Sequence, residues 1–270
     1  MKRELYTITT LSNLHVGSGD INFDIIDNQV QRDTITTLPV INSSSLKGAF
    51  REAAGSESQY TNYIFGPQNG DNDSHQTGAF HFFEAALLSR PVRSNKKAYF
   101  NATSVGTIKS FLTLLEDFNL DFDENVKSAL VVLSKEMVES EKPLIFEDID
   151  GVILEDYEAK ISRVDVSVLV DFLGADLALF NDEDFKTLEL PVLARNYLVN
   201  GESKNLWYEE VVPKKSKFYF VIAKPTNLDD ADKKENIEKF EARFDKTNTV
   251  QFGANKSIGY GLSKVQKVLV

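Results

Sequence analysis

Hydrophobic residues along the chain follow two different periods, and together these periods predict a mixture of strands and helices. Alternation of apolar and polar positions is typical of a half-buried strand, whereas apolar positions three or four residues apart are typical of an amphipathic helix. The elements follow no regular strand-helix-strand rhythm, which favours an α+β fold over a doubly wound sheet. The patterns predict strands over 4–11, 21–25 and 78–88 and helices over 43–54, 104–118 and 229–244, with Gly55 as the stop signal of the first helix.

Turn-forming residues add two features to this outline. Residues 60–78, rich in Asn, Asp, Gly and Gln, predict a long loop. The dipeptide Asn200-Gly201 predicts a tight hairpin turn between strands at 197–199 and 206–208. Such a hairpin could place aromatic groups against unpaired bases, although Trp207 fits a core position better.

The composition is that of an ordinary globular protein. Of the 270 residues, 42% are hydrophobic and 26% are charged. The absence of cysteine excludes disulfides and thiolate metal sites. Neither a signal peptide nor a run long enough to span a membrane is present, so we expect a cytoplasmic protein.

The net charge of −11 argues against nucleic acid until its distribution is considered. Between residues 116 and 184 the sequence has 20 acidic and 5 basic side chains. The remainder has 21 acidic and 25 basic side chains, a net of +4. The central acidic block is best interpreted as a solvated face, and the segments outside it are free to meet an anion.

The helix predicted over 43–54 has the features of an anion-binding element. A serine N-cap, Ser43 or Ser44, leaves backbone N–H groups and the positive end of the helix dipole available. Lys47 and Arg51 stand one turn apart on the same face, and Gly48 between them would let a backbone approach closely. A plain capped helix with two surface cations explains the same residues equally well.

Asp27 resists a simple explanation. It keeps the parity of Ile21, Phe23 and Ile25, so a continuing strand would place a carboxylate at a core position, where acids are rare unless paired or metal-bound. The simpler alternative, which the local sequence favours, is that the chain turns at Ile26. Asp27 would then be an exposed acid or an ion-pair partner of Arg32.

A glycine-rich segment near the end of the chain, 251–262, is a second candidate for phosphate contact. It contains Gly253, Gly259 and Gly261 together with Lys256, and its backbone could lie against phosphates. A turn between two strands explains it nearly as well.

The ordered combination of these segments resembles the RAMP superfamily of CRISPR effector proteins, and within it the repeated backbone subunits of type III-B Cmr complexes. The resemblance extends from residue 14 to residue 262 and is weakest in the acidic block. The segments that carry it are LHVGSG at 14–19, IDNQVQR at 26–32, LPVI at 38–41, SSLKG at 44–48, RPVRS at 90–94, LWYEEVVP at 206–213 and the terminal glycine loop.

The resemblance implies a ferredoxin-like or RRM-like palm with inserted helices and a thumb hairpin. We expect one domain over 1–270, with a helical and acidic insertion around 104–185 and the hairpin around 191–212. The partners it implies are guide RNA, complementary target RNA, further copies of the chain and other Cmr subunits, without a membrane. It assigns cleavage to Asp27 with a divalent metal ion, Mg²⁺ or Mn²⁺, which Asp27 would help to hold. The candidate RNA contacts are His15, Gly17, Ser18, Gly19, Arg32, Ser44, Ser45, Lys47, Gly48, Arg51, Arg93, Gly253, Lys256, Gly259 and Gly261.

Other residues are weaker candidates. Glu209 and Glu210 could add a metal ligand, but acids beside a hairpin usually face solvent. His75 and His81 lack ligand spacing, and a histidine beside a glycine loop, as His15 is, is more often structural.

Two alternatives to a nuclease stay open: a scaffold that binds guide RNA without cutting, including the type III-A equivalent, and an interaction module that uses the acidic block.

Overall fold

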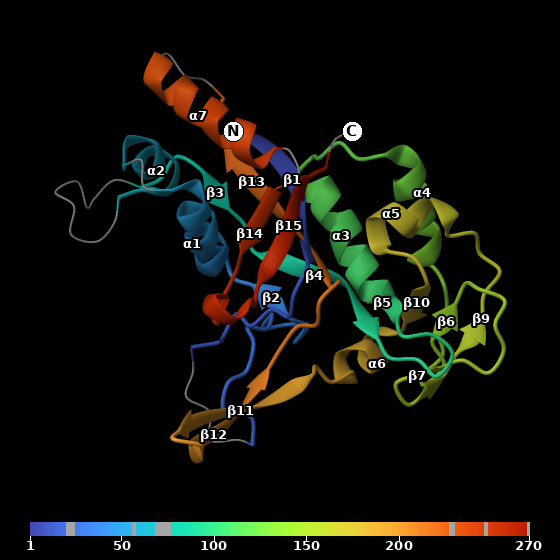
Figure 1. The fold of residues 1–270 in the computed structure, drawn as a ribbon. Helices are drawn as coiled ribbons and strands as arrows, with labels where there is room; N and C mark the ends of the chain where they lie inside the picture. Colours follow the sequence, from blue (N-terminus) through green and yellow to red (C-terminus); the bar gives the residue numbers. More distant parts are fainter. Residues whose placement is uncertain (20–24, 56–57, 68–76, 227–229, 246–247, 269–270) are drawn as a thin grey trace.

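The structure is a computed structural model that describes residues 1–19, 25–55, 58–67, 77–226, 230–245 and 248–268. In this part of the chain the main feature is an eleven-stranded mixed sheet in the order β14-β15-β1-β13-β4-β5-β10-β6-β9, with β2 on β4 and β3 on β13 (Figure 1). The strands are β1 (Lys2–Thr10), β2 (Val40–Ile41), β3 (His81–Phe82), β4 (Ala85–Val92), β5 (Phe100–Ser104), β6 (Leu144–Ile145), β9 (Lys160–Ile161), β10 (Leu177–Phe180), β13 (Lys217–Lys224), β14 (Asn248–Gln251) and β15 (Leu262–Lys267).

The centre of the sheet is buried on both faces. Strand β1 pairs antiparallel with β13 from Lys2 opposite Lys224 to Thr9 opposite Lys217. Because side chains alternate along a strand, Phe218 and Phe220 enter one core while Tyr219 enters the other. A near-continuous apolar run of this kind is typical of a strand covered on both sides.

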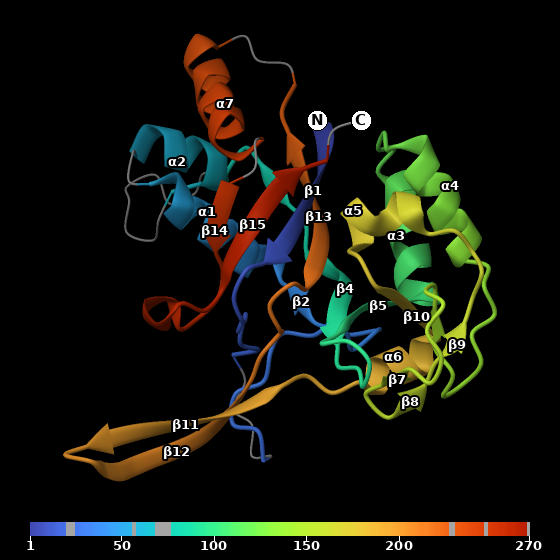
Figure 2. The same cartoon turned by 45° about the vertical axis from the view of Figure 1, so that its right-hand side comes forward.

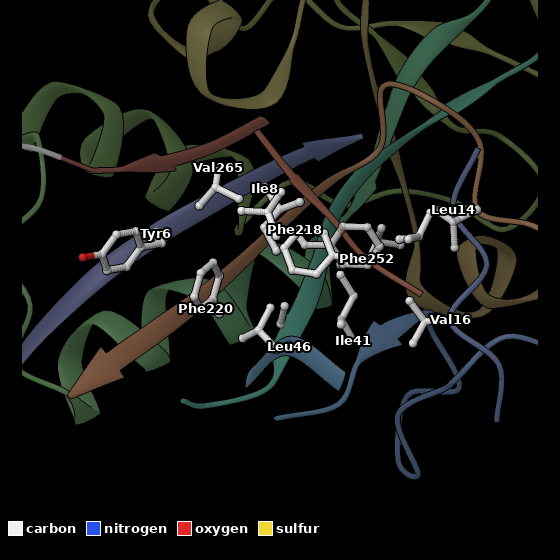
Figure 3. Close-up of a cluster of buried hydrophobic side chains, with 14 of the residues drawn as sticks. Tyr6, Ile8, Leu14, Val16, Ile41, Leu46, Phe218, Phe220, Phe252 and Val265 are labelled. Carbon is white, nitrogen blue, oxygen red and sulfur yellow. The ribbon is translucent and has the colours of Figure 1, made fainter. Parts of the chain in front are cut away.

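Helices cover each face (Figures 1 and 2). On the face of Phe218 and Phe220 lie α1 (Ser43–Ala54), α2 (Ser58–Phe65) and α7 (Ala231–Phe244), whose aromatic and aliphatic side chains complete the core shown in part in Figure 3. On the face of Tyr219 lie α3 (Val105–Asp117), α4 (Glu124–Leu133) and α5 (Val170–Leu173). The short α6 (Asp182–Thr187) follows β10. The expected α+β class is confirmed.

The three helices predicted from sequence are present, with one correction at the start of α1 and one in the loop predicted after it. The N-cap of α1 is Asn42, not a serine, and it makes no side-chain capping bond. Gly55 ends α1 at φ +98°, as its stop signal predicts. The loop predicted over 60–78 is wrong at its start, because α2 continues to Phe65 and buries Ile64 and Phe65.

Two of the predicted strands also differ from those in the structure. The strand predicted over 78–88 is divided into β3 and β4, with Phe83 and Glu84 outside both strands. The strand predicted over 21–25 lies mostly outside the described residues. Its last residue, Ile25, is at a bend and 86% exposed, so the alternation does not continue toward Asp27.

A long hairpin projects from the body of the molecule (Figure 2). Its strands are β11 (Val192–Val199) and β12 (Glu202–Glu210), joined at the predicted Asn200-Gly201 turn, where both residues have positive φ. A smaller pair, β7 (Ile153–Leu154) and β8 (Tyr157–Glu158), lies within the acidic block. No helix in the described part of the chain is long and apolar enough to cross a membrane.

Candidate active site and nucleic-acid interface

Asp27 lies at the base of the projecting hairpin. Its neighbour Asn28 bridges to β12 through two backbone bonds: the Asn28 N–H donates to Tyr208 O (3.1 Å), and the Glu210 N–H donates to Asn28 O (2.9 Å). The Asp27 side chain is exposed, and its Oδ2 accepts a hydrogen bond from the Tyr208 N–H at 2.8 Å. One carboxylate oxygen is therefore fixed by the hairpin backbone while the side chain as a whole faces solvent.

Glu210 fixes the segment that follows Asp27. It is 5% exposed, its Oε2 accepts from the Val30 N–H (3.1 Å), and its Oε1 pairs with the Arg32 guanidinium. Arg32 also donates to Thr37 O at 2.9 Å. The expectation that Glu210 faces solvent is wrong, and the suggested partner of Arg32, Asp27, is replaced by this buried glutamate.

Glu209, the preceding residue, is also buried and joins three segments. It accepts hydrogen bonds from Arg195 Nη1 (3.0 Å) and Asn255 Nδ2 (2.7 Å), and its Oε1 lies 3.9 Å from His15 Nε2. Arg195 also lies over the rings of Trp207 and Tyr260. The expectation of a solvent-facing Glu209 is therefore wrong. Trp207 is half-buried on the hairpin rather than in either core.

His15 is buried between the hairpin base and the two glycine loops, the first at 17–19 and the terminal one at 251–262. Its Nδ1 lies 2.7 Å from Glu210 O, and since a carbonyl oxygen can only accept, Nδ1 carries the proton. The His15 carbonyl accepts from the Ala254 N–H at 2.9 Å. His15 therefore supports this surface from beneath.

The terminal glycine loop packs closely against the first one. Gly253 has φ +73°, and a Cβ there would overlap the His15 carbonyl oxygen. Gly261 is buried at φ +74°, and a Cβ there would overlap Phe252 O. Glycine is required at both positions by the contact of the chain with itself. Gly259 is exposed on the same loop.

The other predicted residues of the first loop border the Asp27 segment. Gly17 is half-buried, whereas Ser18 and Gly19 are exposed. The Ser18 N–H donates to Gln29 O at 3.0 Å, which connects the loop to the residues just after Asp27.

Helix α1 brings its predicted cations to this side of the molecule. Burial and the neighbouring Arg51 charge both lower the pKa of Lys47, so the two cations lie close together. Arg51 lies over the Phe65 ring at 5.8 Å. Lys256 of the terminal loop pairs with Glu52 of α1, so the loop and the helix are neighbours.

The serines and glycine at the start of α1 are differently exposed. Ser44 and Gly48 are exposed, and Ser45 accepts from Gln31 Nε2 at 3.1 Å. Gln31 in turn accepts from the Asn42 N–H at 2.9 Å, so α1 is tied to the Asp27 segment.

Arg93 belongs to a different neighbourhood. It is exposed just after β4, and its guanidinium donates to Glu155 Oε2 (2.8 Å from Nε and 2.6 Å from Nη2) in the turn between β7 and β8. This bond raises the pKa of Arg93 and offsets its charge. The contacts of Arg93 thus lie with the acidic block rather than with the Asp27 segment.

Within the described residues, Asp27 does not belong to a group of three acids or histidines close enough to share a metal ion. In the described part, the three acids close enough to share an ion are Glu4, Glu241 and Asp245, and the Lys224 ammonium lies among them. Asp27 offers a single exposed carboxylate, whose hard oxygens are the kind of ligand that a divalent cation such as Mg²⁺ would prefer. His81 is exposed on β3, and His75 lies outside the described residues.

These features define a class: an α+β protein whose sheet carries helices on both faces, with an exposed acid fixed at the base of a projecting hairpin. The chain belongs to the RAMP superfamily, whose family model matches residues 7–264. This confirms the resemblance seen in the sequence.

Individual proteins extend the relationship over the whole chain. The CRISPR system Cmr endoribonuclease Cmr4 of Pyrococcus furiosus is 27% identical over 98% of this chain and 95% of its own length. A type III-B Cmr-beta complex bound to cognate target RNA contains a chain of the same fold, with a TM-score of 0.78, 21% identity and coverage of 99% and 98%. Oligomeric Cmr4 from Pyrococcus furiosus gives a TM-score of 0.74 at 24% identity, with both chains covered completely.

Proposed function

We propose that this protein is the repeated backbone subunit of a type III-B CRISPR ribonucleoprotein, and that it binds guide RNA and cleaves complementary target RNA. The observation that carries the proposal is the exposed Asp27 carboxylate held by the Tyr208 N–H where the hairpin leaves the body. The near full-length relative named as an endoribonuclease supports the same reaction. The similarity to an oligomeric protein supports association with further copies, and the similarity to a Cmr complex supports other Cmr subunits as partners.

RNA supplies its own nucleophile, so the site has little covalent chemistry to perform. Attack of a 2′-OH on the adjacent phosphate needs alignment, removal of the hydroxyl proton and stabilisation of charge. The carboxylate of Asp27 accepts the proton, while its bond to the Tyr208 N–H fixes its orientation. The bond between phosphorus and the 5′-oxygen breaks, and the leaving oxygen takes a proton from water, so the products are a 2′,3′-cyclic phosphate and a 5′-hydroxyl. A divalent metal ion held in part by Asp27 would supply additional stabilisation of the phosphate charge.

We propose that the guide backbone follows the surface between the two glycine loops and α1. Lys47 and Arg51 supply the positive charge, and exposed backbone at Ser18 and Gly19 allows close approach. His15 and Gly261, which are buried, shape this surface from behind. The other proposed contacts of this surface are Ser44, Ser45, Gly17, Gly48, Gly253, Lys256, Gly259 and Arg32. Arg93, which lies with the acidic block, would contact RNA away from this surface.

The proposed organisation is a single domain over 1–270, with an insertion around 104–185 and a thumb around 191–212, acting in the cytoplasm. The preference for a type III-B rather than a type III-A complex is supported by the names of the relatives.

The test is the substitution Asp27→Asn in the complex assembled with guide RNA. It keeps the shape and the hydrogen-bond acceptor for Tyr208 but removes the base, so we expect cleavage of 5′-labelled target RNA to fall by at least about a hundredfold with guide binding unchanged. Asp148→Asn is the matched control, since it makes the same charge change at an exposed acid of the acidic block.

Normal cleavage by Asp27→Asn, or a 3′-hydroxyl at the new end of the 5′-labelled fragment made by the wild type, would contradict the assignment of Asp27. Retained guide binding with no target cleavage even in the wild-type complex would identify the chain as a scaffold that binds RNA without cutting.

A further inference from the structure

A second candidate site lies between the sheet and the acidic block. A cavity of about 300 Å³ opens between the turn 33–38, strand β4 and the first turns of α3 and α6. Part of its wall is apolar and includes Leu38, Val40 and Leu87. None of the residues of the proposed cleavage site or of the proposed RNA contacts lines this cavity.

The charged groups that line the cavity are mostly acidic. Asp33, Glu84 and Asp182 contribute three carboxylates, and Lys186, the one basic residue among the described lining residues, is already paired with Glu183 at 3.1 Å. Burial and the charge of Asp33 together raise the pKa of Glu84. The cavity wall therefore carries an excess of negative charge.

Two of these carboxylates have their own hydrogen bonds, and one has none. Asp182 Oδ1 accepts from the Gly106 N–H at 2.6 Å, at the start of α3. Asp33 Oδ1 accepts from the Thr36 N–H at 2.6 Å and from the Thr36 hydroxyl at 2.7 Å. Among the described residues, Glu84 has neither a hydrogen-bond partner nor an ion-pair partner, so its charge is available to a ligand.

Tyr219 supplies an independent observation. The residue is only 3% exposed, and its ring packs edge-on against Phe111 with centroids 4.9 Å apart. Within the described ranges no hydrogen-bond partner is recorded for its hydroxyl, and the hydroxyl oxygen does not belong to the fully buried polar atoms, so it reaches accessible space. Tyr219 and Asp33 both line the cavity, and burial together with the charge of Asp33 raises the pKa of the Tyr219 hydroxyl.

We propose that this cavity binds an ammonium or guanidinium group at the end of a hydrocarbon chain. The carboxylates of Glu84 and Asp33 would meet the cationic group, the Tyr219 hydroxyl would accept one of its hydrogens, and the apolar wall would contact the methylene stem. The ligand could be a free aliphatic amine or a lysine or arginine side chain of a second copy of this chain.

A bare metal ion fits this cavity less well. In the described residues, the acids of the cavity do not form a group of three with ligand oxygens close enough to share an ion. The volume of about 300 Å³ is instead that of a small-molecule site, since such cavities begin at about this volume.

The test uses the full-length chain and NMR of its leucine and valine methyl groups. We expect saturable shifts of Leu38, Val40 and Leu87 with n-butylammonium and n-butylguanidinium, and binding of the neutral n-butanol at least about tenfold weaker. Glu84→Gln should weaken binding of the cations about fivefold, the loss of one charged hydrogen bond at a partly exposed site. Tyr219→Phe should weaken it about threefold and retain the packing on Phe111.

Two controls separate this site from the rest of the molecule. Glu158→Gln, at an exposed acid on β8, should leave the affinity unchanged, and so should Asp27→Asn. The inference is overturned if the shifts fail to saturate, if n-butanol reproduces them, or if Glu84→Gln binds as well as the wild type.

A second measurement distinguishes the two possible sources of the cationic group, a free amine and a side chain of a second copy. Spermidine binding at the same methyl groups by a monomeric chain assigns the site to free amines. Weaker self-association of Glu84→Gln in sedimentation experiments, together with weaker self-association of the wild type in the presence of n-butylammonium, assigns the site to a side chain of a second copy.

Discussion

The strongest prediction about stability concerns Glu209, because this buried acid connects the hairpin to both glycine loops. Glu209→Ala removes the acceptor for Arg195 and for Asn255 and leaves their donors unpaired. Breaking a buried ion pair from one side costs about 3–5 kcal/mol, but the Arg195 side chain is 23% exposed and recovers part of its hydration. We therefore expect a loss of about 2–3 kcal/mol in the free energy of unfolding.

Urea unfolding of the isolated chain measures this loss. With a slope of about 3 kcal/mol per molar urea for a chain of this size, the midpoint should fall by about 0.7–1 M. Glu209→Gln keeps the shape of the side chain and one acceptor oxygen, so its free energy of unfolding should fall about half as much as that of Glu209→Ala. In the assembled complex, Glu209→Ala should reduce target cleavage more than guide binding, because the hairpin base that holds Asp27 is loosened.

A midpoint within about 0.2 M of the wild type would refute the role of Glu209 as a connecting residue. Equal losses for the alanine and glutamine variants would show that the charge itself stabilises this junction.

Two further predictions use charge. Burial alone would raise the pKa of Glu4, but the ammonium groups around it outweigh burial and lower the pKa from 4.5 to about 2. Its ionised form therefore adds about 3 kcal/mol of stability above pH about 4.5, and this is lost as the pH falls toward about 2. Glu4→Gln should remove that dependence in acid titrations followed by circular dichroism. The double variant Lys47→Ala and Arg51→Ala should lower the slope of log affinity against log salt by about 1.4 for single-stranded RNA, measured by filter binding, whereas Lys135→Ala should not change it.

Local sequence patterns predicted the elements whose burial has a clear period. Helix α3 buries Ile108, Phe111 and Leu115, and α7 buries Phe240 and Phe244, in each case at helical spacing. Helix α2 was missed because its sequence, SQYTNYIF, contains several turn-forming residues and is followed by many more. Its stability comes from packing against α1 and α7, which a local pattern does not contain.

Asp27 shows the limit of local patterns at the site. The sequence left open whether it was a buried strand residue or an exposed acid, because both readings depend on which segment lies beside it. The partner that fixes its carboxylate is a backbone N–H 181 positions further along the chain. Only the resemblance to a family, carried by several segments in order, singled it out.

The burial of two successive acids at the end of β12 follows from the way the hairpin joins the body. From Glu202 to Tyr208 both faces of β12 are largely free, but at Glu209 the strand enters the molecule and both faces become covered at once. Neighbouring residues on a strand point to opposite faces, so Glu209 meets Arg195 and the terminal glycine loop while Glu210 meets Arg32. The hairpin is therefore anchored from both sides beside Asp27, and a displacement of its tip must act on the segment that carries the proposed catalytic carboxylate.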